Sequence, residues 1–180
     1  HLSLRRQRQM CIRDSHPIAA LTSDALDLVH NALPPGIAVT RKLMSDDARA
    51  TGNPTQVSQI VLNLVKNAAD AMDGRGEVTV TLEKIDLDEA AAGALNLRPG
   101  EWISLSFADQ GCGISRETRD RIFEPFFTTK PVGKGTGLGL SVVYSIVTGW
   151  GGTVHIDSEV DKGTTAMVYL SLIHISEPTR

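Results

Sequence analysis

Several features that mark common protein classes are missing from this 180-residue sequence. Its two cysteines, Cys11 and Cys112, are too few for a disulfide framework and have no metal-ligand spacing. No apolar run approaches the roughly 18 residues needed to cross a bilayer, and the start lacks the pattern of a signal peptide. The net charge of −3 offers no general attraction for nucleic acid. These absences predict one cytoplasmic globular domain that does not bind nucleic acid.

The two ends of the chain differ in character from its middle. The stretches "RRQRQMCIRDS" and "SLIHISEPTR" resemble translated sequencing-adaptor read-through rather than the ends of a domain. We therefore interpret residues 1–15 and 171–180 as non-native tails and residues 16–170 as the domain. The alternative is a genuine basic arm and a short native tail.

Apolar periodicity predicts the elements of residues 16–170. A helix over residues 21–33 is predicted by an apolar face of Leu21, Ala25, Leu28, Val29 and Ala32. Asn53-Pro54 predicts the capped start of a longer helix that ends near Met72. The other expected elements are strands over 37–43, 78–82, 102–108, 152–158 and 164–170, helices over 115–123 and 138–148, and a loop over 124–137. This order predicts an α/β two-layer sandwich, a mixed sheet covered on one face by helices.

The second predicted helix carries polar residues along one edge. Asn63, Asn67 and Asp70 recur at helical spacing, with Lys66 close to them. Two neutral amides can ligate a hard cation through their carbonyl oxygens without adding negative charge beside a triphosphate. Taken alone, the pattern also fits a polar helix edge that faces solvent.

Two glycine-containing motifs follow. Asp109-Gln110-Gly111-Cys112-Gly113-Ile114 comes after a strand, where a carboxylate can accept a hydrogen bond from a base and glycines let a flat ring approach the backbone. The second motif, residues 133–140, leads into a helix whose first N–H groups can bind phosphate oxygens. It has neither the spacing of a P-loop nor the position of a Rossmann turn. Each motif alone also fits an ordinary turn.

Together the motifs resemble those of sensor histidine kinases. Residues 63–71 resemble the N box, 109–114 the G1 box, 123–130 the F box and 135–140 the G2 box. Residues 151–165 resemble the closing strands of the family, so that the resemblance covers residues 21–170. It implies the ATP-binding fold shared with gyrase, mismatch-repair and heat-shock-chaperone ATPases, with ATP and Mg²⁺ as cofactors.

The resemblance also implies residue roles. Asn67 is the expected Mg²⁺ ligand, with Asn63 and Lys66 assisting at the metal or phosphates, and Asp109 is the expected acceptor for the adenine amino group. Residues 115–137 are expected to form a mobile lid, packed by Phe123, Phe126 and Phe127. The other residues expected to bind ATP are Gly111, Gly113, Ile114, Lys130, Lys134, Gly135, Thr136, Gly137, Leu138, Gly139, Leu140 and Thr164.

One position separates two activities of this fold. Hydrolytic relatives place a glutamate four residues before the metal-binding asparagine, where it acts as general base. Here that residue is Asn63, which favours phosphoryl transfer over hydrolysis. The family's acceptor is a histidine followed by an acid, and none of the five histidines has an acid after it.

The resemblance therefore implies a fragment of a longer kinase. Its expected partners are a dimerisation and phosphoacceptor domain outside this chain and a response regulator receiver domain, with a homodimer as the full-length state. The resemblance leaves open a membrane anchor elsewhere in the full-length protein. The alternative functions are a slow ATPase of the gyrase or chaperone type and a nucleotide-binding module without catalysis.

Overall fold

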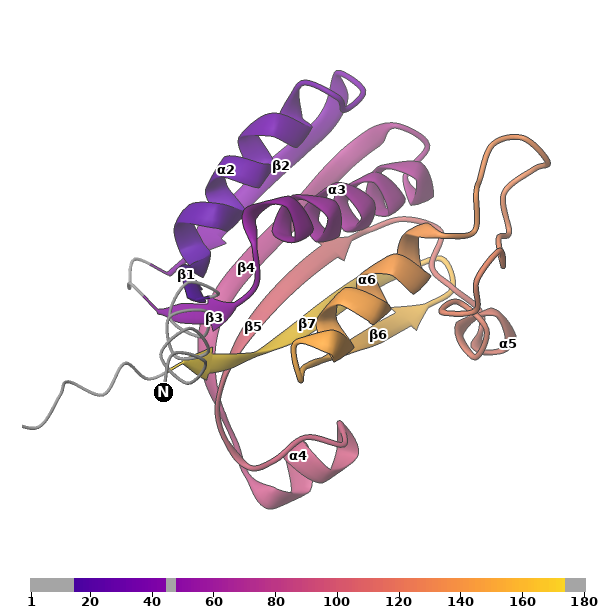
Figure 1. Cartoon of the computed structure of the whole chain (residues 1–180). Helices are drawn as coiled ribbons and strands as arrows, with labels where there is room; N and C mark the ends of the chain where they lie inside the picture. The colour runs from indigo at the N-terminus through magenta and orange to yellow at the C-terminus, as the bar shows by residue number, and fades with distance from the viewer. Residues whose placement is uncertain (1–14, 45–47, 174–180) are drawn as a thin grey trace, which may run out of the picture.

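The computed structural model describes residues 15–44 and 48–173 of the chain (Figure 1). Cys11, His1 and His174 therefore lie outside the described residues. In chain order the elements are β1 (Ser15–Pro17), α2 (Ile18–His30), β2 (Gly36–Leu43), β3 (Arg49–Thr51), α3 (Pro54–Ala71), β4 (Arg75–Leu87), α4 (Glu89–Ala94), β5 (Gly100–Asp109), α5 (Arg116–Arg119), α6 (Gly139–Gly149), β6 (Thr153–Glu159) and β7 (Gly163–Ile173).

The strands form one mixed sheet. Its order is β1-β3-β7-β5-β4-β2, and β6 also pairs with β7, along residues 163–169, whereas β3 pairs with Leu172 and Ile173 at the end of that strand. Only the β2–β4 pair is parallel among the strand pairs of the described residues. Helices α2, α3 and α6 lie on one face of this sheet (Figure 1). The prediction of a mixed sheet with helices on one face is therefore confirmed.

Helix α3 lies centrally among the three helices and supplies much of the core. Asn53 caps it by accepting a hydrogen bond from the N–H of Gln56 at 2.8 Å, and Pro54 occupies the first turn, where no N–H is needed. The predicted inner face is confirmed, because Val57, Ile60, Val61, Leu64, Val65 and Ala68 are all buried. Burying this face leaves the edge with Asn63, Asn67 and Asp70 for other contacts.

Helix α2 corrects a prediction. It spans residues 18–30 rather than 21–33, and it ends four residues before Pro34. Leu28, expected on the inner face, is 69% exposed, and Ala32 is exposed beyond the helix end. The buried face is made instead by Ile18, Thr22, Ala25, Leu26 and Val29. Packing against α3 and the sheet determines which residues of α2 are buried. The spacing of the apolar residues alone fits more than one buried face.

The excursion between β4 and β5 holds a second, smaller core. Helix α4, which the sequence did not predict, is capped by Asp88, and its Ala92 is buried with Leu87, Trp102 and Tyr169. The indole N–H of Trp102 donates to the carbonyl of Arg98 at 2.9 Å. Figure 1 shows α4 at the end of the sheet remote from α5. None of the predicted site residues lies in this region.

The ends of the sheet include residues assigned to tails. Strand β1 begins at Ser15, and β7 continues through Ser171, which pairs with Trp102, to Ile173. The short strand β3 lies between β1 and β7. The sequence predicted neither β1 nor β3, because three residues are too few to display a period. That residues 1–15 and 171–180 are non-native stays a prediction.

Candidate nucleotide site

The asparagine edge of α3 faces the start of α6. Asn63 and Asn67 are half-buried. A methyl group placed on Gly139, the first residue of α6, would lie 3.4 Å from Oδ1 of Asn63. The fold therefore brings the N-box motif against the helix start of the third motif, as the resemblance implies. Lys66, on the same helix, is exposed.

The glycine turn after β5 packs against the end of α3. A methyl group on Gly111 would lie 2.6 Å from the carbonyl oxygen of Ala71, so only glycine fits there. The next N–H, that of Cys112, donates to this same carbonyl at 3.0 Å. Gly113 has a φ of +71° and faces the backbone of Glu159. Close approach therefore requires both glycines, and it places Asp109 at the end of the helix that carries the asparagines.

Asp109 is a half-buried carboxylate with backbone partners. Its Oδ1 accepts from the N–H of Gly111 at 2.8 Å, and the backbone of Thr164 on β7 also donates to this side chain. Burial raises the pKa of Asp109, and these two hydrogen bonds partly oppose the shift. The carboxylate is thus held in one orientation by the backbone of two neighbouring segments.

Ser158 on β6 joins these segments, and the sequence assigned it no role. Its Oγ accepts from the N–H of Ile114 at 2.8 Å, donates to the carbonyl of Gly163 at 3.0 Å and lies 2.8 Å from Oγ1 of Thr164. Thr164 and Ile114 are thereby fixed beside Asp109. A serine in a strand carries no local signal, because its partner Ile114 lies 44 residues earlier in the chain.

The start of α6 lacks a side-chain cap. Side chains of Asn53, Asp88 and Ser115 cap α3, α4 and α5, whereas none within the described ranges caps α2 at Pro17 or α6 at Leu138. The first N–H groups of a helix are then available to an anion. Leu138 donates its N–H to Oγ1 of Thr136 at 3.3 Å, and Leu140 packs on the core.

Two contacts shape the loop of residues 124–137. The N–H of Phe126 donates to the carbonyl of Gly137 at 2.8 Å, and a methyl group on Gly137 would overlap the Phe126 backbone. Gly137 has a φ of +70° and Phe126 one of +66°. The loop has no helix or strand, as predicted. Its mobility stays a prediction.

The two lysines of this loop differ in position. Lys130 reaches back to α3, where its ammonium pairs with Asp70 at 2.5 Å. Lys134 is exposed, and its N–H donates to the carbonyl of Pro131 at 3.0 Å. Gly135 lies beside Lys130 rather than at the helix start. The fold therefore brings Lys130 to the asparagine edge, and it leaves Lys134 at the surface.

The three phenylalanines of the F box divide between two environments. Phe123 stacks with Tyr144 of α6 at a centroid distance of 5.0 Å, and the Arg121 guanidinium lies 4.5 Å from the Phe127 ring. Phe126 is 74% exposed. Phe123 and Phe127 therefore pack against other side chains, as expected, whereas Phe126 does not. That these rings belong to a mobile lid stays a prediction.

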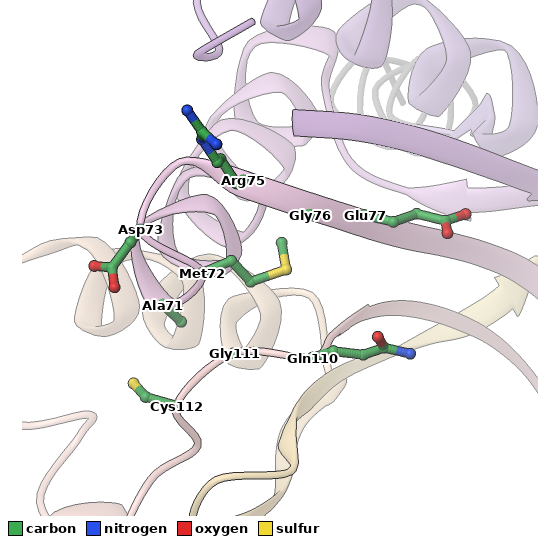
Figure 2. A pocket seen from close by; sticks show the side chains of 9 residues that line it. All are labelled: Ala71, Met72, Asp73, Arg75, Gly76, Glu77, Gln110, Gly111 and Cys112. Atoms are coloured by element: carbon green, nitrogen blue, oxygen red, sulfur yellow. The ribbon is translucent and has the colours of Figure 1, made fainter. Parts of the chain in front are cut away.

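A cavity of about 310 Å³ lies beside Gly111, at the end of α3. Figure 2 shows the side chain of Met72 extending between the start of β4 and the segment after β5. The lining residues are Ala71, Met72, Asp73, Arg75, Gly76, Glu77, Gln110, Gly111 and Cys112. Of the predicted site residues only Gly111 takes part. The cavity therefore borders the candidate nucleotide site without containing it.

None of the helices in the described part of the chain is both long and apolar enough to cross a membrane. Within the same ranges, no group of three or more histidine, cysteine, aspartate or glutamate side chains is placed to hold a metal ion. A metal ion at the asparagine edge would therefore be bound by amide oxygens, and a bound nucleotide or water would have to supply its remaining ligands.

Comparisons with known proteins find similar chains among sensor kinases. The chain is 45% identical over 116 residues to the sensor kinase CckA of Brucella abortus, which covers 64% of the chain and 12% of that protein. It is 29% identical over 180 residues to sporulation kinase E of Bacillus subtilis, covering 99% of the chain and 21% of the relative. The chain thus spans only about an eighth to a fifth of the length of these two relatives.

A solved structure shows the same fold. The mycobacterial sensor histidine kinase MprB superposes with a TM-score of 0.70 at 25% identity, over 88% of this chain and 96% of that chain. The sequence profile of "Histidine kinase-, DNA gyrase B-, and HSP90-like ATPase" matches residues 52–174, more than half of the chain. The chain therefore belongs to this ATPase family, as a catalytic ATPase domain of the kind found in sensor histidine kinases.

Proposed function

We propose that this domain binds Mg²⁺-ATP and transfers the γ-phosphoryl group to a histidine on a dimerisation domain outside this chain. The observation that carries the proposal is the junction of α3 and α6. An amide-bearing helix edge lies against an uncapped helix start, with Oδ1 of Asn63 near Gly139. This junction offers amide oxygens to a metal and N–H donors to phosphates.

The residues present fit a magnesium ion carried by the nucleotide. Mg²⁺ usually keeps few protein ligands and takes the rest from phosphates and water. Asn67 would hold it, with Asn63 beside it, and their neutral amides add no repulsion toward a triphosphate. When bound, the ion would neutralise charge that develops on the phosphates during transfer.

The chain's own residues position the two ends of the nucleotide. Asp109, fixed by the N–H groups of Gly111 and Thr164, accepts from the adenine amino group. The start of α6 and Lys130 hold the phosphates. In the transfer itself, a ring nitrogen of the acceptor histidine forms a bond to the γ-phosphorus as the bond to the β–γ bridging oxygen breaks, and ADP leaves with that electron pair.

Hydrolysis and simple nucleotide sensing are the alternatives. Asn63 stands where the hydrolytic relatives have a glutamate, and an amide cannot take a proton from water. Of the histidines in the described ranges, His16, His30 and His155 are followed by Pro17, Asn31 and Ile156 rather than by an acid. We therefore propose that the acceptor histidine and the response regulator are outside this chain. We place the reaction in the cytoplasm.

The proposal is tested by supplying the missing acceptor. The chain is mixed with radiolabelled ATP, Mg²⁺ and a separate two-helix dimerisation domain that contains its histidine. We expect label on that domain, stable to base and labile to acid, and none on a variant with the histidine replaced. Turnover of ATP without labelling of the dimerisation domain would favour the hydrolase. Saturable ATP binding without turnover and without labelling would favour the sensing module.

We expect Asp109→Asn to change nucleotide selectivity without unfolding the domain. The amide oxygen can still accept from the N–H of Gly111, but the amide nitrogen can now donate to the oxygen that guanine carries in place of the adenine amino group. Calorimetric titration should show ATP binding more weakly and GTP relatively better. Equal loss for the two nucleotides would contradict the role of Asp109.

The same variant gives an independent stability readout. Because burial raises the pKa of Asp109, its favourable contribution is complete at pH values below the unfolded pKa and is lost as pH rises through the folded pKa. At neutral pH the ionised carboxylate is therefore a liability that asparagine removes. The melting temperature of Asp109→Asn should exceed that of the wild type at pH 7, and the difference should shrink as pH falls through the raised folded pKa of Asp109. A variant that melts lower at pH 7 would refute this.

A further inference from the structure

One ion pair of the structure has no place in the mechanism above. Lys130 and Asp70 lie 60 residues apart in the chain, and the distance between Nζ and Oδ2 is 2.5 Å. The two side chains are 34% and 44% exposed, so the contact lies at the surface without being fully solvated. This contact links the 124–137 loop to α3.

The loop is folded around the stem of Lys130. The N–H of Lys130 donates to Oγ1 of Thr128 at 3.1 Å. A methyl group on Gly135 would lie 3.0 Å from Cδ of Lys130 and 2.7 Å from Oγ1 of Thr128, so the absence of a side chain there makes room for both. The turn and the glycine together aim the lysine across the loop toward α3.

Asp70 lies on the same helix edge as the proposed metal ligand. It follows Asn67 by three residues, which places the two side chains on neighbouring turns of α3. Lys130 is therefore held within about one turn of the place proposed for the phosphates. A carboxylate and a triphosphate are both anions, so they compete for one ammonium group and repel each other.

We propose that Asp70 is a positioning residue that occupies Lys130 in the nucleotide-free domain and yields it to the phosphates when ATP binds. The inference rests on the proposed function, because it assumes that phosphates reach this edge of α3. Asp70 thus has two opposite effects: it orders the loop, and it weakens nucleotide binding by keeping the ammonium engaged. Exposed pairs are weak, so we expect each effect to be roughly two- to fivefold.

Two variants of the 180-residue chain separate these effects. Loop order is measured without nucleotide as the rate of chymotrypsin cleavage after Phe126, an exposed residue that all variants retain. Nucleotide binding is measured by calorimetric titration of ATP with Mg²⁺. Asp70→Asn and Lys130→Met should each raise the cleavage rate by a similar factor. Their effects on ATP should be opposite: Asp70→Asn lowers the Kd roughly two- to fivefold, and Lys130→Met raises it.

Asp73→Asn is the matched control. Asp73 lies three residues after Asp70, is exposed and pairs with no basic side chain in the described part of the chain. Its replacement removes the same charge from the same end of α3, and it should leave both cleavage and Kd unchanged. The double variant Asp70→Asn with Lys130→Met should be cleaved no faster than either single variant.

Each other outcome overturns a defined part of the inference. Unchanged cleavage of Asp70→Asn means that the pair does not order the loop. Faster cleavage with an unchanged or higher Kd means that Asp70 is only a structural anchor. If Asp73→Asn lowers the Kd for ATP as much as Asp70→Asn does, the effect comes from the loss of a negative charge in general and not from release of Lys130. If the wild type binds no ATP, both the proposed function and the proposed transfer of Lys130 from Asp70 to the phosphates are wrong. If the wild type binds ATP and the variants do not behave as expected, only the proposed role of Asp70 is wrong.

Discussion

Asn67→Ala is expected to weaken Mg²⁺-dependent ATP binding by about one to two orders of magnitude while leaving the domain folded. The neighbours Val65, Ala68 and Ala69 bury the opposite side of α3, so the packing of the helix does not depend on the amide. Alanine is also the best helix former. Losing one polar contact to a charged group weakens binding by about 1.5–3 kcal/mol, or roughly 10- to 150-fold. The measurement is calorimetric titration beside a thermal melt.

Asn31→Ala is the matched control for that variant. Asn31 is an exposed asparagine at the end of α2, where it is the C-cap residue. Its replacement should leave ATP affinity within the error of the wild type. If Asn67→Ala binds as the wild type does, Asn67 is not the metal ligand. A large fall in melting temperature would instead indicate a structural role for the amide.

The second large effect is expected for Gly113→Ala. Gly113 has a φ of +71°, and an added methyl group would overlap the backbone of Glu159 and approach Cα of Val160. The left-handed conformation alone costs a non-glycine residue about 1–3 kcal/mol, and backbone atoms cannot yield as a flexible side chain can. We expect a fall in melting temperature of roughly 2–12 °C together with loss of ATP binding, because this turn fixes Asp109.

Gly93→Ala serves as the control for backbone changes at glycine. Gly93 lies inside α4 with nothing within 4 Å of an added methyl group, so alanine should stabilise the helix slightly. Its melting temperature should equal or exceed that of the wild type, with unchanged ATP affinity. Gly113→Ala with wild-type stability and binding would show that the turn tolerates a side chain, contrary to its observed conformation.

The parts of the fold that the sequence predicted are those with strong local signals. Helix α3 was predicted almost to the residue, because an Asn-Pro start and an unbroken apolar period specify it. Helix α2 lay three residues from its predicted position, and Leu28 was assigned to the wrong face. The short elements β1, β3 and α4 depend on partners far away in the chain, which local periodicity does not encode.

The site was predicted as motifs, and the structure adds the distances between them. The proximity of Asn63 to Gly139 and the packing of Gly111 on Ala71 agree with the resemblance. Ser158 was missed as the residue that joins Ile114 and Thr164, and the pairing of Lys130 with Asp70 was not foreseen. Both are long-range contacts, which local sequence patterns do not encode even where a residue such as Lys130 or Thr164 already had an expected role. The role of each residue in binding stays a prediction.

The central claim, that the α3–α6 junction holds Mg²⁺-ATP, is tested most directly by calorimetric titration of ATP into the 180-residue chain with and without Mg²⁺. The account predicts saturable binding with one site per chain that weakens strongly when Mg²⁺ is removed. Absence of saturable binding at millimolar ATP, in a sample whose thermal melt shows a folded domain, would contradict it.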